Sequence, residues 1–204
     1  MTKVIGLIGD EGSGKTLFGV MLTMILSKMN NAEIYTNMKT LKLNYIDFNE
    51  NFINVINNIK NDKNLLRIHR IAFIDEIHRY MDSRQSMYKQ NIMFSQELVQ
   101  IRKYRFDMVY TNVLTSMLDV RLRAITDIII NCLDYNDDNY NLRYNVYNKK
   151  GQFLVSKTIT INPEIYNYYD TYETINNSGI KGFEPKAKKE NKKIDVNKLN
   201  TIDI

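Results

Sequence analysis

Five short apolar runs recur along the first two thirds of the chain, at residues 3–8, 33–35, 70–75, 107–111 and 128–133. Runs of this length are typical of strands that are buried on both faces, as they are in a parallel sheet. We therefore predict five strands at these positions.

Longer stretches between these runs carry apolar residues at helical spacing, at residues 15–28, 49–59 and 91–105. Ser116, with Asp119 three residues later, predicts a capped helix that runs to about Ala124. The alternation of strands and helices predicts an α/β fold, with a mainly parallel central sheet and helices on both of its faces.

The pattern changes after residue 135, where apolar and polar residues alternate over 142–146 and again over 153–161. The two stretches flank a turn that contains Gly151, so we predict a C-terminal β-hairpin over about residues 140–161. This hairpin is expected to extend one edge of the sheet.

Pro163 ends the hairpin, and we expect a short helical stretch from Glu164 to Tyr168. Residues 1–178 are thus expected to form one domain. Residues 179–204 are polar and rich in lysine, and we predict that they form a flexible tail.

Composition limits the setting of this domain. A length of 204 residues leaves room for one α/β domain and little else. The single cysteine, Cys132, excludes an internal disulfide and a cysteine-based zinc site, and favours a reducing compartment. No run reaches the roughly 18 apolar residues that cross a bilayer, and no signal-like segment precedes the first strand. We expect a soluble protein of the cytoplasm, neither secreted nor inserted in a membrane.

Residues 9–16 match the phosphate-binding loop pattern G-x-x-x-x-G-K-S/T in full, between a predicted strand and a predicted helix. Glycines let successive backbone N–H groups face phosphate oxygens, and the helix N-terminus adds partial positive charge. Lys15 would reach the β- and γ-phosphates of ATP and assist catalysis, and the Thr16 hydroxyl would bind Mg²⁺. The predicted nucleotide-binding residues are Gly9, Glu11, Gly12, Ser13, Gly14, Lys15, Thr16 and Leu17.

An acidic pair, Asp75 and Glu76, follows the third predicted strand. Asp75 would hold the Mg²⁺ ion beside the phosphate-binding loop. Glu76 would orient and deprotonate the attacking water, which favours a hydrolase over a kinase. His78 follows two residues later, and we interpret it as a surface or supporting residue beside the site.

Two asparagines end predicted strands in the same local sequence, Tyr-Thr-Asn. Asn112 stands where a polar side chain could sense the γ-phosphate, and Asn37 is a weaker candidate for that role. Both residues also suit a turn at a strand end.

Such a site also needs a cation beside the phosphates. In a ring-forming NTPase, the neighbouring subunit often supplies this cation. Candidates for this role lie on either side of the fourth strand, at Arg102, Arg105, Arg121 and Arg123. Cations that would suit a nucleic-acid backbone follow the acidic pair, at Arg79, Arg84 and Lys89, and recur in the lysine-rich tail.

These motifs, together with residues 100–107 and the strand that ends at Asn112, resemble the FtsK–HerA superfamily. Within it, the likeness over about residues 3–135 is to the genome-packaging ATPases of the turreted icosahedral viruses of Sulfolobus. The resemblance implies a RecA-like (ASCE) P-loop NTPase fold and a ring oligomer, expected to be a hexamer. It implies that Mg²⁺-dependent ATP hydrolysis drives double-stranded DNA into a preformed viral capsid in the host cytoplasm. It also makes Arg102 or Arg105 the residue that reaches a neighbour's ATP. That superfamily usually has Gln where this chain has Asn112.

Other readings remain open at this point. Filamentous-phage assembly ATPases of the Zot type share the Asp-Glu-x-His-Arg run at residues 75–79, but they carry a membrane segment that we do not find here. A nucleoside monophosphate kinase has a similar loop, but it needs an Asp-Arg motif and an arginine-rich lid. A nucleotide switch without motor activity is the third alternative.

Overall fold

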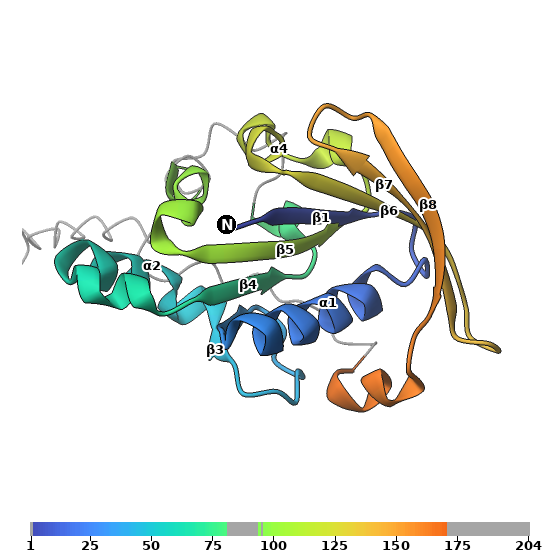
Figure 1. Cartoon of the computed structure of the whole chain (residues 1–204), viewed down its shortest axis with the longest axis horizontal. Helices are drawn as coiled ribbons and strands as arrows, with labels where there is room; N and C mark the ends of the chain where they lie inside the picture. The colour runs from blue at the N-terminus through green and yellow to red at the C-terminus, as the bar shows by residue number, and fades with distance from the viewer. Residues whose placement is uncertain (1, 81–93, 95, 171–204) are drawn as a thin grey trace, which may run out of the picture.

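A computed structural model of the chain describes residues 2–80, 94 and 96–170 (Figure 1). Within these residues a single sheet has the strand order β3-β2-β4-β5-β1-β6-β7-β8. Strands β1 to β6 pair in parallel, and β7 and β8 are antiparallel to their neighbours. The strands are β1 Val4–Ile8, β2 Glu33–Thr36, β3 Ile46–Asp47, β4 Arg70–Ile74, β5 Phe106–Asn112, β6 Ile128–Asn136, β7 Asn141–Asn148 and β8 Phe153–Thr160.

Strand β5 lies between β1 and β4 and pairs with both. The strand that leads into the phosphate-binding loop is therefore not a neighbour of the strand that ends at the acidic pair. This order is that of the RecA-like class, so the predicted fold is confirmed. The register sets Ile8 opposite Asn112 and Ile74 opposite Tyr110, which brings the carboxyl ends of the three strands to one edge.

Apolar side chains fill both faces of the sheet, because neighbouring residues of the buried strands point to opposite sides. On one face, Ala72 and Ile74 pack with α2 (Phe48–Asn61) and α4 (Val120–Ile125). On the other face, Phe73 packs with α1 (Lys15–Asn30). Figure 1 shows α1 and α4 on opposite sides of the sheet, as the sequence pattern predicts.

The helix predicted over residues 91–105 ends earlier than expected. Residues 96–99 are helical, and the chain then tightens into the 3₁₀ helix η4 (Ile101–Tyr104). Arg105 follows with a φ of 58°, in the left-handed region that ends helices. The apolar spacing of Phe94, Leu98 and Ile101 thus continues across a change of helix type. Residues 91–93 and 95 lie outside the described part.

The helix start predicted at Ser116 is wrong. Ser116 lies in the 3₁₀ turn η5 (Thr115–Met117), and α4 begins at Val120 with Asp119 as its N-cap. The Asp119 carboxylate accepts a hydrogen bond from the Arg121 N–H at 2.8 Å. A carboxylate is the stronger acceptor for the unpaired N–H groups of a helix start, which explains the choice.

The predicted hairpin is present as β7 and β8, and it continues from β6 as an antiparallel meander. Strand β6 runs to Asn136, three residues beyond the apolar run that predicted it. After β8 the 3₁₀ helix η6 (Pro163–Tyr168) returns to pack against α1. The predicted tail over residues 179–204 lies outside the described part of the chain.

In the described ranges, none of the helices combines the length and the apolar character that a transmembrane span requires.

Candidate nucleotide-binding site

The loop between β1 and α1 is shaped by glycines with positive φ. Gly9 has φ 143° and Gly14, the residue before α1, has φ 81°. A Cβ atom on Gly9 would stand 2.2 Å from the carbonyl oxygen of Cys132, so no other residue fits there. The first helical bond runs from the Phe18 N–H to the Gly14 carbonyl at 2.9 Å. The N–H groups before it in the first turn remain for a ligand at the helix N-terminus.

Lys15 crosses this loop, and its Nζ donates to the Asp10 carbonyl at 2.6 Å. Burial lowers the pKa of its ammonium group, and the charges of Asp75 and Asp10 oppose that shift. The sequence places Lys15 at the phosphates, and the structure sets its cation at the loop where they would lie.

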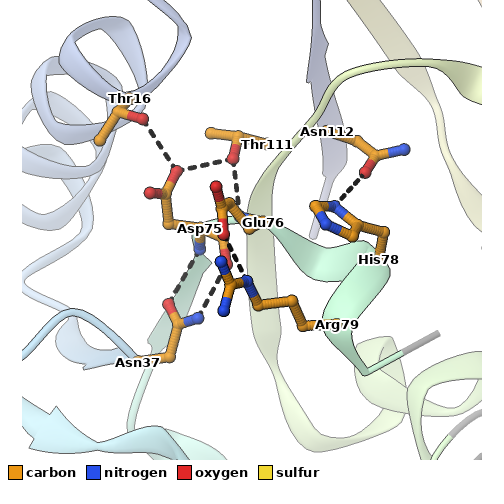
Figure 2. A network of polar contacts seen from close by, with 8 residues as sticks. All are labelled: Thr16, Asn37, Asp75, Glu76, His78, Arg79, Thr111 and Asn112. Atoms are coloured by element: carbon orange, nitrogen blue, oxygen red, sulfur yellow. Dashed lines mark hydrogen bonds and ion pairs between the residues drawn. The ribbon is translucent and has the colours of Figure 1, made fainter. Parts of the chain in front are cut away.

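Asp75 follows β4 and lies beside the loop, almost fully buried (Figure 2). Its Oδ1 accepts a hydrogen bond from the Thr16 hydroxyl at 3.0 Å and a second from the Thr111 hydroxyl at 2.6 Å. Burial raises the pKa of the Asp75 carboxyl group, whereas the two hydroxyl donors favour its charged form.

The geometry of Thr16 and Asp75 suits a magnesium ion. Mg²⁺ takes oxygen ligands, and proteins commonly supply one or two carboxylates while water and phosphate oxygens complete the octahedron. The structure brings the predicted pair together, with the hydroxyl oxygen of Thr16 hydrogen-bonded to a carboxylate oxygen of Asp75. The donor set therefore fits the ion that ATP would carry.

Glu76 stands next to Asp75 in the left-handed region, with φ 52°. Its backbone N–H donates to the Thr111 hydroxyl at 2.8 Å, so one threonine holds both acidic residues. The Glu76 carboxylate is about 41% exposed and pairs with the Arg79 guanidinium. Neither Thr111 nor the Glu76–Arg79 pair was predicted, although Thr111 belongs to the Tyr-Thr-Asn run and Arg79 was noted as a cation near the site.

The two asparagines have different surroundings, as Figure 2 shows. Asn37 bonds to the backbone of Asp75 twice, from its Nδ2 to the carbonyl at 2.8 Å and from the Asp75 N–H to its Oδ1 at 2.9 Å. Asn37 thus positions Asp75 through its backbone and leaves the Asp75 carboxylate to face Thr16 and Thr111. Asn112 contacts His78 Nδ1 through its Oδ1 at 2.9 Å and donates to the Leu114 carbonyl at 2.6 Å. His78 thus supports Asn112, whose role as a sensor stays a prediction.

The structure does not bring Arg102 or Arg105 to the phosphate-binding loop. Arg102 donates to Asp127 Oδ2 at 2.7 Å, and the same oxygen accepts from the Val4 N–H at the start of β1. Arg105 directly precedes β5 and is exposed. Both lie at the amino edge of the sheet, opposite the site. Neither residue therefore belongs to the site of its own chain, and a role at a neighbouring subunit's ATP stays a prediction.

The other predicted cations also lie outside this cluster. Arg121 bonds to Asp119 at the start of α4, and Arg123 is an exposed residue of the same helix. Arg84 and Lys89 lie outside the described residues.

A glycine loop on β1, an acidic pair after β4 and a polar strand end on the intervening β5 define a P-loop NTPase of the RecA-like class. A family model described as zonular occludens toxin (Zot) matches residues 4–175, and the chain belongs to that family. The Zot family is a family of P-loop ATPases, and the sequence offered it as an alternative to the packaging ATPases.

Solved structures share the fold. The N-terminal domain of zonular occludens toxin from Neisseria meningitidis aligns with a TM-score of 0.58 and 18% identity, over 83% of this chain and 100% of that one. The genome packaging NTPase B204 from Sulfolobus turreted icosahedral virus 2, in complex with ATP-gammaS, aligns with a TM-score of 0.54 and 12% identity, over 78% and 98%. No curated protein sequence matches the chain.

Proposed function

We propose that this chain is a Mg²⁺-dependent ATPase that translocates viral DNA during virion assembly. The observation that carries the proposal of ATP hydrolysis is that one residue, Thr111, bonds both to the carboxylate of Asp75 and to the backbone of Glu76. Two carboxylates with different environments are held next to each other, one buried against Thr16 and one partly exposed and paired with Arg79. This arrangement suits one metal ligand and one base for water.

The residues divide the work in the following way. Mg²⁺, when bound with ATP, would neutralise phosphate charge as the reaction proceeds. Thr16 and Asp75 would hold it, and Lys15 would keep the β- and γ-phosphates in place. Glu76 would take the proton of the attacking water, because its side chain is about 41% exposed and its backbone N–H is held by Thr111.

Glu76→Gln tests the hydrolytic step. Glutamine keeps the shape of the side chain but cannot accept a proton, so phosphate release should fall by about a hundredfold to ten-thousandfold. ATP binding, measured by equilibrium titration, should be retained. Undiminished phosphate release by this variant would overturn the assignment, and transfer of phosphate to a nucleoside monophosphate would place the chain among kinases.

The proposed work of this hydrolysis is the transport of double-stranded DNA into a preformed capsid by a ring, in the host cytoplasm. It is supported by the sequence resemblance to the packaging ATPases and by the fold shared with a genome packaging NTPase. The Zot match over residues 4–175 favours a second candidate, a filamentous-phage type of assembly ATPase.

The DNA that stimulates hydrolysis separates the two candidates. Phosphate release should be measured without DNA, with a linear duplex and with a single strand of equal length, at low and moderate salt. Stimulation by the duplex supports packaging into a capsid, and stimulation by the single strand alone supports the filamentous-phage type. A rate that is indifferent to both nucleic acids contradicts a DNA motor.

A further inference from the structure

A pocket of about 520 Å³ opens beside the phosphate-binding loop. Its lining on one side consists of residues of the loop and of the start of α1, including Lys15, Thr16 and Leu17. Its lining on the other side consists of Tyr135, Asp137, Tyr166 and Tyr169. The volume falls within the range of roughly 300–1,000 Å³ that is usual for sites of small ligands.

The aromatic side of this pocket comes from the C-terminal third of the chain. Tyr135 is near the end of β6 and Asp137 is in the turn that follows it. Tyr166 belongs to η6, the orange helix near the start of α1 in Figure 1, and Tyr169 follows it. Ile165 anchors η6 in the same apolar cluster as Leu17. The fold thus brings residues far apart in sequence against the loop.

Close packing sets the distance between the two sides. A Cβ atom built on Gly14 would lie 3.1 Å from the Cβ of Tyr135 and 2.8 Å from Leu142 Cδ1. The phosphate-binding loop therefore rests directly on the strands that carry the aromatic side. Any group joined to a triphosphate in that loop has the tyrosines within reach.

The chemistry of the aromatic side suits a flat ring that also carries a hydrogen-bond donor. The rings of Tyr166 and Tyr169 are nearly parallel, at 17° with centroids 6.4 Å apart, and Tyr135 stands at 54° to Tyr166. The Tyr166 hydroxyl donates to Asp137 Oδ1 at 3.1 Å, which orients a carboxylate that can only accept.

We propose that this pocket is the nucleoside subsite of the phosphate-binding loop. The base would stack on a tyrosine face, and Asp137 would accept a hydrogen bond from a donor of the nucleoside. Two donors have that chemistry, the exocyclic amino group of the base and the hydroxyl groups of the ribose. The proposal rests on the proposed function, because the phosphates must occupy the loop.

Stacking and hydrogen bonding would make separate contributions here. Every base has a π-face, so stacking on tyrosine adds affinity without strong selection among bases. Asp137 is exposed, so water can replace a missing donor, but only a nucleoside that carries a donor gains the hydrogen bond to its oriented carboxylate. Selectivity among nucleotides should therefore follow Asp137 and not the tyrosines.

Equilibrium titration of the full chain in a Glu76→Gln background tests this subsite without turnover. The ligands are Mg²⁺ complexes of ATP and of inorganic tripolyphosphate, which has no nucleoside. ATP should bind at least tenfold more tightly than tripolyphosphate. Tyr166→Leu, which removes the ring, should weaken ATP binding by about tenfold and leave tripolyphosphate unchanged. Tyr168→Leu, on the same turn but outside the pocket lining, is the matched control and should change neither.

Asp137→Asn identifies the donor. If the carboxylate binds the base, the variant should weaken ATP but not inosine triphosphate, which lacks the amino group. If it binds the 2′-hydroxyl of the ribose, the variant should weaken both of these but not dATP, and if it binds the 3′-hydroxyl, it should weaken all three. Equal affinity for ATP and tripolyphosphate in the parent protein, or Tyr166→Leu and Asp137→Asn variants that bind ATP like their parent, would overturn the proposal. Failure of the parent to bind either ligand would instead refute the proposed function.

Discussion

Thr111 links the two acidic residues of the site through one hydroxyl group. It donates to the buried Asp75 carboxylate and accepts from the Glu76 N–H, and it is itself buried. Glu76 has a left-handed backbone, and the hydrogen bond from its N–H to Thr111 helps to hold the backbone in that conformation. Thr111 is thus a positioning residue for both carboxylates.

Thr111→Val removes the hydroxyl and keeps the shape of the side chain. We expect ATP hydrolysis to fall by about 10- to 100-fold, since small displacements of a catalytic group have effects of that order. Stability should fall by about 1–3 kcal/mol, because Asp75 loses a buried donor. Phosphate release and urea denaturation measure the two effects.

Thr126→Val is the control for that change. Thr126 is equally buried, and its hydroxyl donates to the Leu122 carbonyl at 2.9 Å, away from the acidic pair. Its replacement should lower stability without a matching loss of hydrolysis. Equal losses of activity in the two variants would show that Thr111 acts through stability alone.

The sequence predicted the parts of the site that depend on local spacing. Lys15, Thr16, Asp75 and Glu76 are found together because each stands at a fixed offset from a strand end. Thr111 was missed because its contact depends on the register of β5 on β4, which no local pattern encodes.

At the scale of elements, the phosphate-binding loop and the C-terminal strands act as one packed unit. Gly14 has a left-handed backbone, and it also faces Leu142 of β7 at a distance that excludes a Cβ atom. The conformation of the loop thus depends on strands that follow it by more than a hundred residues.

Gly14→Ala should lower stability by more than about 2 kcal/mol, from left-handed strain together with overpacking. It should also weaken ATP binding, because the loop must move. Gly151→Ala is a matched control: Gly151 has a similar φ of 75°, with nothing within 4 Å of its built Cβ. It should cost about 1 kcal/mol from backbone strain alone and leave ATP binding intact. Denaturant unfolding and equilibrium titration distinguish the two, and equal effects would contradict the packing argument.

Helix α4 offers a test that depends on pH. The hydrogen bond from Arg121 holds the pKa of the Asp119 carboxyl below its usual value. Because the folded-state pKa is depressed, the stabilisation is present above the unfolded pKa of about 3.9 and is lost as pH falls through the folded value.

Asp119→Asn retains a good N-cap but removes the charge. It should be less stable than the parent by up to about 1 kcal/mol near neutral pH, since the arginine is partly exposed. The difference should shrink as the pH falls below about 4, when the parent also loses its charge. Urea denaturation over this range measures it. A difference that stays constant with pH would show that charge is not the cause.

The helices and strands were predicted well where the spacing of apolar residues fits one kind of structure. They were predicted less well where the same sequence pattern fits two. The apolar spacing of Phe94, Leu98 and Ile101 fits an α-helix, yet the chain has changed to a 3₁₀ helix by Ile101. Ser116 and Asp119 are both good caps, and Asp119, whose carboxylate is the stronger acceptor, is the one that caps α4.

At the scale of the whole molecule, the amino edge of the sheet lies opposite the site and carries both candidate arginines. Arg102 is engaged by Asp127 and the Ile125 carbonyl, whereas Arg105 is exposed. Arg105 is therefore the better candidate for the proposed contact with a neighbouring subunit.

Mixing variants tests a contribution from the neighbour. If the proposed ring forms, Arg105→Ala and Glu76→Gln should each be nearly inactive, but together they should recover hydrolysis, because a mixed ring would pair an intact Glu76 with an intact Arg105. Arg102→Ala should mainly lower stability. Phosphate release by the separate and mixed variants is the measurement. No recovery on mixing, with both variants shown to associate, would contradict a role for Arg105 in the neighbour's site.

Because β5 lies between β1 and β4, the nucleotide site exists only in the folded chain. Thr16, Asp75 and Thr111 come from three separate segments that meet only once the sheet has formed. The unfolded chain has no such site, so bound nucleotide shifts the folding equilibrium by about 2.7 kcal/mol at a hundredfold excess over Kd. A melting temperature that rises by several degrees with Mg²⁺ and ATP, and much less in Thr111→Val, is the expected sign of this linkage.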